Sequence, residues 1–121
     1  MARRVVVNLA TGLEDAERVT VAFLVANAAL ARGNPVAMFL TKEAVRLALP
    51  GHAGGVACDG CPPLASLFAK FAEGGGELIT CPVCFGARQL NEGDLVANAR
   101  IGGATPLLDW IGEEAATVFS Y

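Results

Sequence analysis

Residues 77–84, with the sequence ELITCPVC, join a short apolar run to a cysteine and a proline. We predict a buried strand over residues 77–81, because three glycines end the preceding helix and Pro82 opens the next one. Proline suits the first turn of a helix, where its missing N–H would have no partner in any case. The stretch therefore predicts a strand that passes directly into a helix, with Cys81 at the junction.

Two further strand and helix units precede this junction. Residues 5–10 and 36–40 are almost continuously apolar, which is typical of strands buried on both faces of a parallel sheet. Between them, an acidic first turn and apolar side chains at helical spacing predict a long helix that stops at residues 32–33. A shorter helix is predicted over residues 41–50, ended by a proline and a glycine.

The second half of the chain continues the alternation. A pair of prolines at 62–63 opens a helix that the glycines at 74–76 end, and a second helix runs over residues 105–111. Short strands are predicted near 96–101, where the signal is weakest, and over 117–121.

This alternation predicts a single α/β domain that spans residues 1–121, the size of one average domain. We expect a mostly parallel sheet of five strands with helices on both faces, which is a three-layer α/β/α sandwich.

The composition indicates that part of the surface is covered by another subunit. Hydrophobic residues make up 54% of the chain and charged residues 17%, against roughly 25% in an ordinary soluble domain. The helix over residues 19–31 is apolar almost all round, so we expect its outer face to meet a second copy in a homo-oligomer. The net charge of -3 offers no basic surface for a phosphate backbone, which argues against nucleic acid as a partner.

Membrane insertion and export are not expected either. The longest uncharged apolar stretch, residues 19–31, is shorter than the ~20 residues that a membrane span needs. The first residues lack a small-residue cleavage site, so residues 5–10 are assigned to a strand and not to a signal peptide. We therefore expect a cytoplasmic protein, in which paired thiols more often serve metal or sulfur chemistry than structural disulfides.

The four cysteines are predicted to lie at one edge of the sheet. Ligands of open α/β sheets gather beyond the carboxyl ends of the strands, and Cys81 lies at such an end. If the helix that follows residues 62–63 runs back antiparallel to the next strand, its amino end brings Cys58 and Cys61 to the same edge. We therefore expect the four thiols to converge there.

Cys81 has the position of a nucleophile. The N–H groups and the dipole of the following helix favour its thiolate, and Arg88 on a later turn adds positive charge. Cys84 follows three residues on, close to the same helical face, where it can resolve a persulfide or a disulfide on Cys81. A Cys81/Cys84 dithiol that cycles between oxidised and reduced forms is an alternative, although this CPVC segment lacks the usual context of a thioredoxin motif.

Zinc binding is the other main alternative. The pattern C-x2-C, nineteen residues, C-x2-C has the spacing of a four-thiolate zinc site made by Cys58, Cys61, Cys81 and Cys84. In that case the protein would be a non-catalytic oligomeric scaffold or regulator. His52 is then a further metal candidate or a proton relay, although a solvated loop histidine explains it too. A last alternative is that the four cysteines only pack.

The chain resembles the DsrE/DsrF-like proteins, which include sulfur-relay members. The resemblance is carried by the first strand with residues 11–15, by the alanine-rich helix, by residues 77–90 and by the LLDW segment at 107–110. It implies a five-stranded parallel α/β/α domain and a homo-oligomer, a trimer or a hexamer. The Cys58/Cys61 pair is an addition to the pattern.

The resemblance also implies a function. In the sulfur-relay members a cysteine at the position of Cys81 carries sulfur as a persulfide. We therefore expect Cys81 to accept sulfane sulfur from a donor protein and to pass it to an acceptor thiol, as a sulfurtransferase or a sulfur carrier. Cys84 and Arg88 would assist it, and no cofactor is required.

Overall fold

The computed structural model describes residues 3–121, and its centre is a parallel sheet of five strands. The sheet has the order β4-β3-β2-β1-β5, and each pair of neighbouring strands is parallel. The strands are β1 (Val5–Leu9), β2 (Val36–Leu40), β3 (Glu77–Thr80), β4 (Ala99–Ile101) and β5 (Thr117–Ser120). The predicted five-stranded α/β fold is confirmed. The weakest strand of the prediction, β4, begins three residues later than expected.

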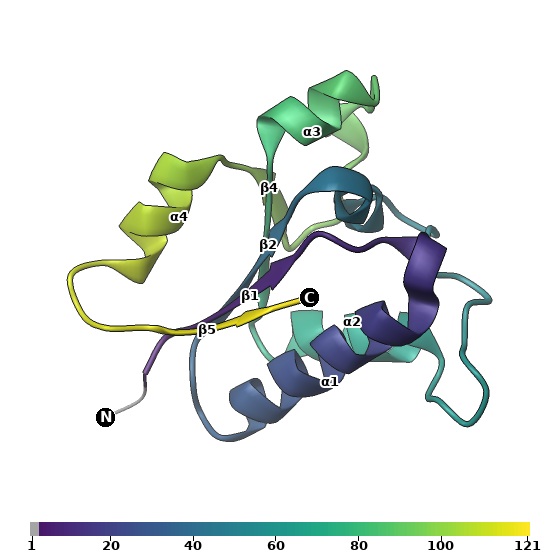
Figure 1. The fold of residues 1–121 in the computed structure, drawn as a ribbon, viewed down its shortest axis with the longest axis horizontal. Coiled ribbons are helices and arrows are strands. Elements are labelled where there is room, and N and C mark those ends of the chain that lie inside the picture. The colour runs from purple at the N-terminus through teal and green to yellow at the C-terminus, as the bar shows by residue number, and fades with distance from the viewer. Residues whose placement is uncertain (1–2) are drawn as a thin grey trace.

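Helices cover both faces of this sheet. They are α1 (Ala16–Ala31), α2 (Leu64–Glu73), α3 (Pro82–Ala87) and α4 (Ala104–Ile111), with short 3-10 helices η1 (Leu13–Asp15), η2 (Lys42–Ala48) and η3 (Glu92–Asp94). Figure 1 shows α1 and α2 side by side on one side of the sheet and α4 on the other. The change of face follows from the topology, because the chain moves from β1 outward to β4 and then returns across the sheet to β5.

The main core lies between the sheet and the pair α1 and α2. Apolar side chains that alternate along β1 and β2, such as Val7 and Met38, are fully buried there. Phe23 of α1 meets both α2 phenylalanines: its ring stacks on Phe68 at 4.1 Å between centroids and meets Phe71 edge-on at 5.6 Å. This packing fixes α2, and with it the loop that precedes it.

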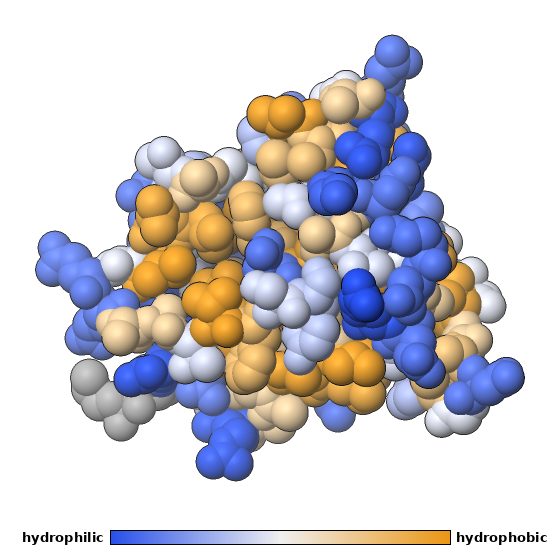
Figure 2. Space-filling view, in the orientation of Figure 1, coloured by the Kyte–Doolittle hydropathy of each residue, from blue (hydrophilic) through white to orange (hydrophobic). Residues whose placement is uncertain are grey.

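The opposite face is covered sparsely. No residue of α4 is buried, and Leu108 of α4 is 63% exposed. Trp110 anchors this helix, because its Nε1 donates a 2.6 Å hydrogen bond to Glu77 Oε2 and the Arg4 guanidinium lies 5.1 Å from its ring centroid. Figure 2 shows apolar surface on α3 and around α4. None of the helices within residues 3–121 is both long enough and apolar enough to cross a membrane.

Candidate functional site: the thiols at the end of β3

The strands β1, β2 and β3 end at one edge of the sheet, where η1, η2 and α3 follow them. Cys81 is the residue between β3 and α3. Its backbone N–H donates a 2.9 Å hydrogen bond to the Leu40 carbonyl, and its own carbonyl accepts one of 3.0 Å from Phe85 N–H. The first bond continues the pairing of β2 with β3 and the second closes the first turn of α3, so the position of Cys81 is fixed from both sides.

The Cys81 thiol is free, half-buried and shifted toward the thiolate form. Burial alone raises its pKa, because the charged sulfur loses solvent. The backbone N–H groups of Cys84 and Val83 and the Cys84 side chain stabilise the thiolate and outweigh burial, so that the pKa lies below its ordinary value of 9.0. These N–H groups belong to the first turn of α3, which starts directly after Cys81.

Cys84 lies one turn further along α3 and is also free and half-buried. Both thiols pack against the margin of the core. Between them, Val83 is 77% exposed and marks the outer side of α3. Both cysteines are thus partly exposed at the start of α3.

Arg88 connects α3 to η2. Its Nη1 donates a 3.1 Å hydrogen bond to the Cys84 carbonyl, and its Nε lies 3.3 Å from Glu43 Oε2. Glu43 Oε2 also accepts a 2.6 Å bond from Arg46 Nε. The hydrogen bond from Arg46, assisted by Arg88, lowers the pKa of the Glu43 carboxyl. Arg88 therefore acts on the backbone of α3, and its charge is paired with Glu43.

A pocket of about 240 Å³ adjoins this ion-pair cluster. It is lined by Leu13, Glu14, Glu43, Arg46 and His52. Burial, together with the positive charge of Arg46, lowers the pKa of His52 below 6.5, which favours the neutral imidazole at pH 7. His52 is thus part of a pocket wall and not a fully solvated loop residue.

Gly12 allows η1 to lie close to this cluster. A Cβ atom at this position would lie 2.8 Å from the Glu43 carbonyl oxygen, so η1 and η2 approach closely only with glycine. The Gly12 N–H donates a 2.8 Å hydrogen bond to Glu14 Oε1, which holds this carboxylate at the pocket.

The family model of the DsrE/DsrF-like family matches residues 4–120. The chain belongs to the DsrE/DsrF-like family. The crystal structure of the ychN protein from E. coli has a TM-score of 0.79 and 19% sequence identity, with 100% of both chains covered. At this identity the likeness shows the shared fold. No curated protein matches the chain.

In this DsrE/DsrF-like chain the other two cysteines form a disulfide. Cys58 and Cys61 are bonded to each other, with 5.1 Å between their Cα atoms, in the loop before α2. Cys58 Sγ lies 3.8 Å from Thr20 Oγ1 of α1, on the face that α1 and α2 cover. In residues 3–121 no group of three or more His, Cys, Asp or Glu side chains is placed to hold a metal ion.

The predicted convergence of Cys58, Cys61, Cys81 and Cys84 is therefore wrong. Both pairs lie toward the predicted edge of the sheet. Cys58 and Cys61, however, lie against α1, whereas Cys81 and Cys84 belong to α3, which packs against η2. The order of strands and helices in the sequence predicts the edge of the sheet at which the cysteines lie. It does not predict on which face of the sheet the loop before α2 lies. The residues present do not fit a four-thiolate zinc site.

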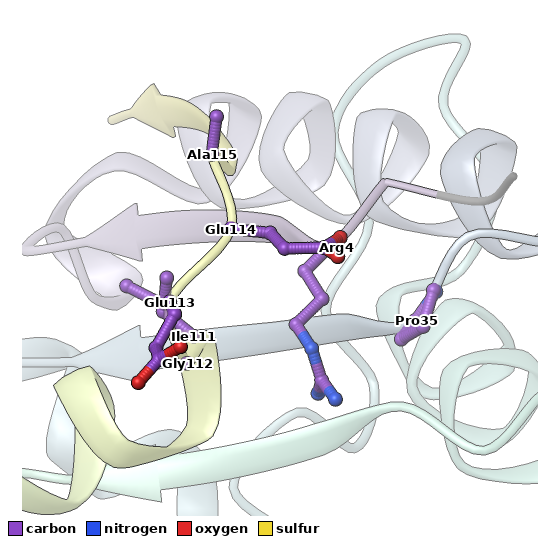
Figure 3. A pocket seen from close by; sticks show the side chains of 7 residues that line it. All are labelled: Arg4, Pro35, Ile111, Gly112, Glu113, Glu114 and Ala115. Atoms are coloured by element: carbon purple, nitrogen blue, oxygen red, sulfur yellow. The ribbon is translucent and has the colours of Figure 1, made fainter.

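A second pocket, of about 330 Å³, lies at the opposite edge of the sheet. It is formed by Arg4, Pro35 and residues 111–115, and the Arg4 side chain extends into it from the start of β1 (Figure 3). No cysteine lines this pocket.

Cys81, Cys84 and Arg88 are singled out by the sequence and Glu14 is explained there by helix capping, whereas the sequence does not point to Glu43 and Arg46. Glu43 and Arg46 lie three residues apart directly after β2, a spacing typical of a local ion pair. Their relation to Arg88 depends on the packing of η2 against α3, for which the sequence carries no local signal.

Proposed function

We propose that this protein carries sulfane sulfur as a persulfide on Cys81 and passes it to a partner thiol. The observation that carries the proposal is a free, half-buried thiol at the carboxyl end of β3, with its pKa lowered by the N–H groups of α3. Membership of the DsrE/DsrF-like family, which suggests a sulfur-relay role, supports it.

The transfer consists of two displacements that balance. The Cys81 thiolate attacks the outer sulfur of a donor persulfide, forming a new S–S bond while the donor thiolate leaves. An acceptor thiolate then attacks the outer sulfur on Cys81, takes it over as its own persulfide and regenerates the Cys81 thiolate. No net oxidation occurs, and no cofactor is needed.

Cys84 gives the persulfide a second exit. Its thiolate can attack Cys81 Sγ and expel the outer sulfur as hydrosulfide, which leaves a Cys81–Cys84 disulfide. The two electrons that reduce the sulfane sulfur come from the two thiolates, so the product disulfide must be reduced before the next cycle. Hydrosulfide is not released when an acceptor thiol attacks the persulfide before Cys84 does.

Protein donors and acceptors fit this site better than small thiols alone. The highly exposed Val83 lies between the two thiols and gives α3 an apolar contact surface. The neighbouring cluster of Glu43, Arg46 and Arg88 supplies charges of both signs at its border. We infer that a partner docks on α3 and on η2.

We also propose a homo-oligomer, a trimer or a hexamer, as the working form. The helix α4 is rich in apolar residues, and none of its residues is buried. Its apolar side chains can therefore contact a second copy of the chain. On the edge strand β5, Val118 is exposed, whereas Phe119 lies on the α1 side of the sheet, where it lines a pocket with Val25 and Ala28.

The test is a transfer cycle followed by mass spectrometry. The protein is loaded with a small persulfide donor, freed of it, and mixed with an isotope-labelled acceptor thiol. We expect one sulfur on the Cys81 peptide to appear on the acceptor. Cys81→Ser should abolish loading, whereas Cys84→Ser should load and hold the sulfur for longer.

The same cycle separates the alternatives. Loading of Cys81→Ser at the rate of the native protein would exclude Cys81 as the carrier. A native protein that takes up no sulfur but forms a reversible Cys81–Cys84 disulfide would instead be a dithiol redox protein.

A further inference from the structure

The CDGC segment at residues 58–61 forms a second sulfur site that the transfer chemistry at Cys81 does not use. Backbone contacts hold its turn as well as the disulfide. The Cys61 N–H donates a 2.9 Å hydrogen bond to the Cys58 carbonyl, and Gly60 has a φ of 76°, a left-handed value that glycine adopts freely. The Leu64 N–H donates a 2.9 Å hydrogen bond to the Val56 carbonyl, which joins the two ends of the loop. These contacts do not involve the sulfur atoms, so we expect the turn to keep the two thiols close together after reduction.

The two sulfurs have different surroundings. Cys58 Sγ lies against α1, 3.8 Å from the Oγ1 of the buried Thr20. Cys61, which is half-buried like Cys58, has its Sγ 3.8 Å from the Asp59 carbonyl, in a contact that is open to solvent. An incoming thiolate from solution thus has access to Cys61, whereas Cys58 is shielded on the α1 side.

Thr20 can stabilise the reduced form. Its hydroxyl donates a 2.7 Å hydrogen bond to the Ala16 carbonyl, so the oxygen remains free to accept. In the disulfide, Cys58 has no hydrogen to donate. After reduction the Cys58 S–H can donate to Thr20 Oγ1, a contact that exists only in the dithiol form.

We propose that Cys58–Cys61 is a redox site that exchanges electrons with a protein dithiol, separate from the sulfur transfer at Cys81. A thiolate of the dithiol attacks Cys61 Sγ, the Cys58–Cys61 bond breaks, and the departing Cys58 thiolate takes a proton from water. The second thiol of the partner, after losing its proton, attacks the mixed disulfide and releases the Cys61 thiolate, which is protonated in turn. Two electrons pass to the loop, and the partner leaves as a disulfide.

The experiment uses the full chain carrying Cys81→Ser and Cys84→Ser, so that only Cys58 and Cys61 report and the result is independent of the proposed transfer. Reduced thioredoxin is the protein dithiol probe, and alkylation with peptide mapping follows the two thiols. We expect thioredoxin to reduce the Cys58–Cys61 bond of the folded protein at a rate within about tenfold of that at which a small dithiol reduces the protein unfolded in urea. We also expect oxidised glutathione to re-form the same disulfide. Reduction that occurs only after unfolding, or failure to re-form the disulfide, would overturn the proposal.

Single variants test which sulfur is attacked. In the same background, Cys58→Ser leaves Cys61 alone and Cys61→Ser leaves Cys58 alone. We expect Cys61 to be alkylated about tenfold faster than Cys58, because Cys58 faces α1. Equal rates, or a faster Cys58, would contradict the proposed direction of attack.

Discussion

The sulfur of Cys81 is subject to two opposing effects. Burial disfavours its charge, while the N–H groups of Val83 and Cys84 and the Cys84 side chain favour it. The outcome, a pKa below 9.0, increases the fraction of thiolate at neutral pH. Because the folded pKa is depressed, ionisation of Cys81 adds stability as the pH rises toward 9.0, and this contribution is lost as the pH falls through the folded pKa.

Removal of the Cys84 thiol should make Cys81 less acidic. In Cys84→Ala the side-chain contribution disappears but the backbone N–H groups remain, so we expect the pKa of Cys81 to rise relative to the native protein. The pH dependence of iodoacetamide alkylation, read on the Cys81 peptide, measures this value. Cys84→Ser keeps a polar hydrogen at the position and is the matched control. An unchanged alkylation profile in Cys84→Ala would show that the Cys84 side chain has no part in the acidity.

The sequence predicts those site residues that lie close together along the chain. Cys81, Cys84 and Arg88 lie within one short segment, so a local pattern of strand, cysteine and proline is enough to select them. Glu43 belongs to another segment and reaches Arg88 across 45 residues of sequence. Such a contact follows from strand order and helix packing, which no local pattern encodes.

At the scale of elements, α3 is held on η2 by Arg88. The bond from Arg88 to the Cys84 carbonyl and the contact with Glu43 are made by one planar guanidinium. The position of α3, and with it the N–H groups that face Cys81, therefore depends on the shape of this side chain as well as on its charge.

Substitutions of Arg88 distinguish shape from charge. We expect Arg88→Ala to slow sulfur loading by about 3- to 10-fold, and Arg88→Lys to resemble it, because one ammonium group does not reproduce the fork of donors. Loading rates and the pH profile of Cys81 alkylation provide the two measurements. A lysine variant with native loading would show that charge alone suffices and would contradict a positioning role.

The end of α2 depends on a close approach of Gly76 to Phe71. A Cβ atom at Gly76 would lie 2.4 Å from the ring of Phe71, which is buried in the core. We expect Gly76→Ala to lower the free energy of unfolding by about 1–3 kcal/mol. Gly86→Ala is the control, because a Cβ there meets nothing within 4 Å and should stabilise α3 by up to about 1 kcal/mol. Urea unfolding of both variants measures the difference, and equal stabilities would contradict the packing argument.

The elements differ in how well the sequence predicts them. The strands β1 and β2 were predictable because both of their faces are buried, which leaves an almost continuous apolar run. The strand β4 has three residues and pairs only with β3, so its signal is weak. The prediction that all four thiols meet was wrong because of one loop. The loop before α2 lies at the predicted edge of the sheet but on the face that α1 covers.

At the scale of the whole molecule, the two faces of the sheet are unequal. The pair α1 and α2 encloses a dense core, whereas α4 leaves apolar side chains exposed on the other face (Figures 1 and 2). The low fraction of charged residues anticipates this imbalance, although composition does not indicate where on the surface it lies.

We expect the oligomer to depend on α4. Leu108→Glu places a charge at an exposed position of this helix and should dissociate the oligomer into smaller species while the fold is retained. Light scattering after size-exclusion chromatography gives the mass, and circular dichroism checks the fold. Leu24→Glu, on the exposed side of α1, tests the other face, which the sequence predicts to meet a second copy. A native protein that is monomeric at micromolar concentration would contradict the proposed oligomer.

The most direct test of sulfur transfer is the mass of the Cys81 peptide after the native protein has met a persulfide donor at neutral pH. We expect one added sulfur atom on that peptide, which a reducing thiol removes and which is absent in Cys81→Ser. An unmodified Cys81 peptide, or sulfur that appears equally on every cysteine peptide, would contradict it.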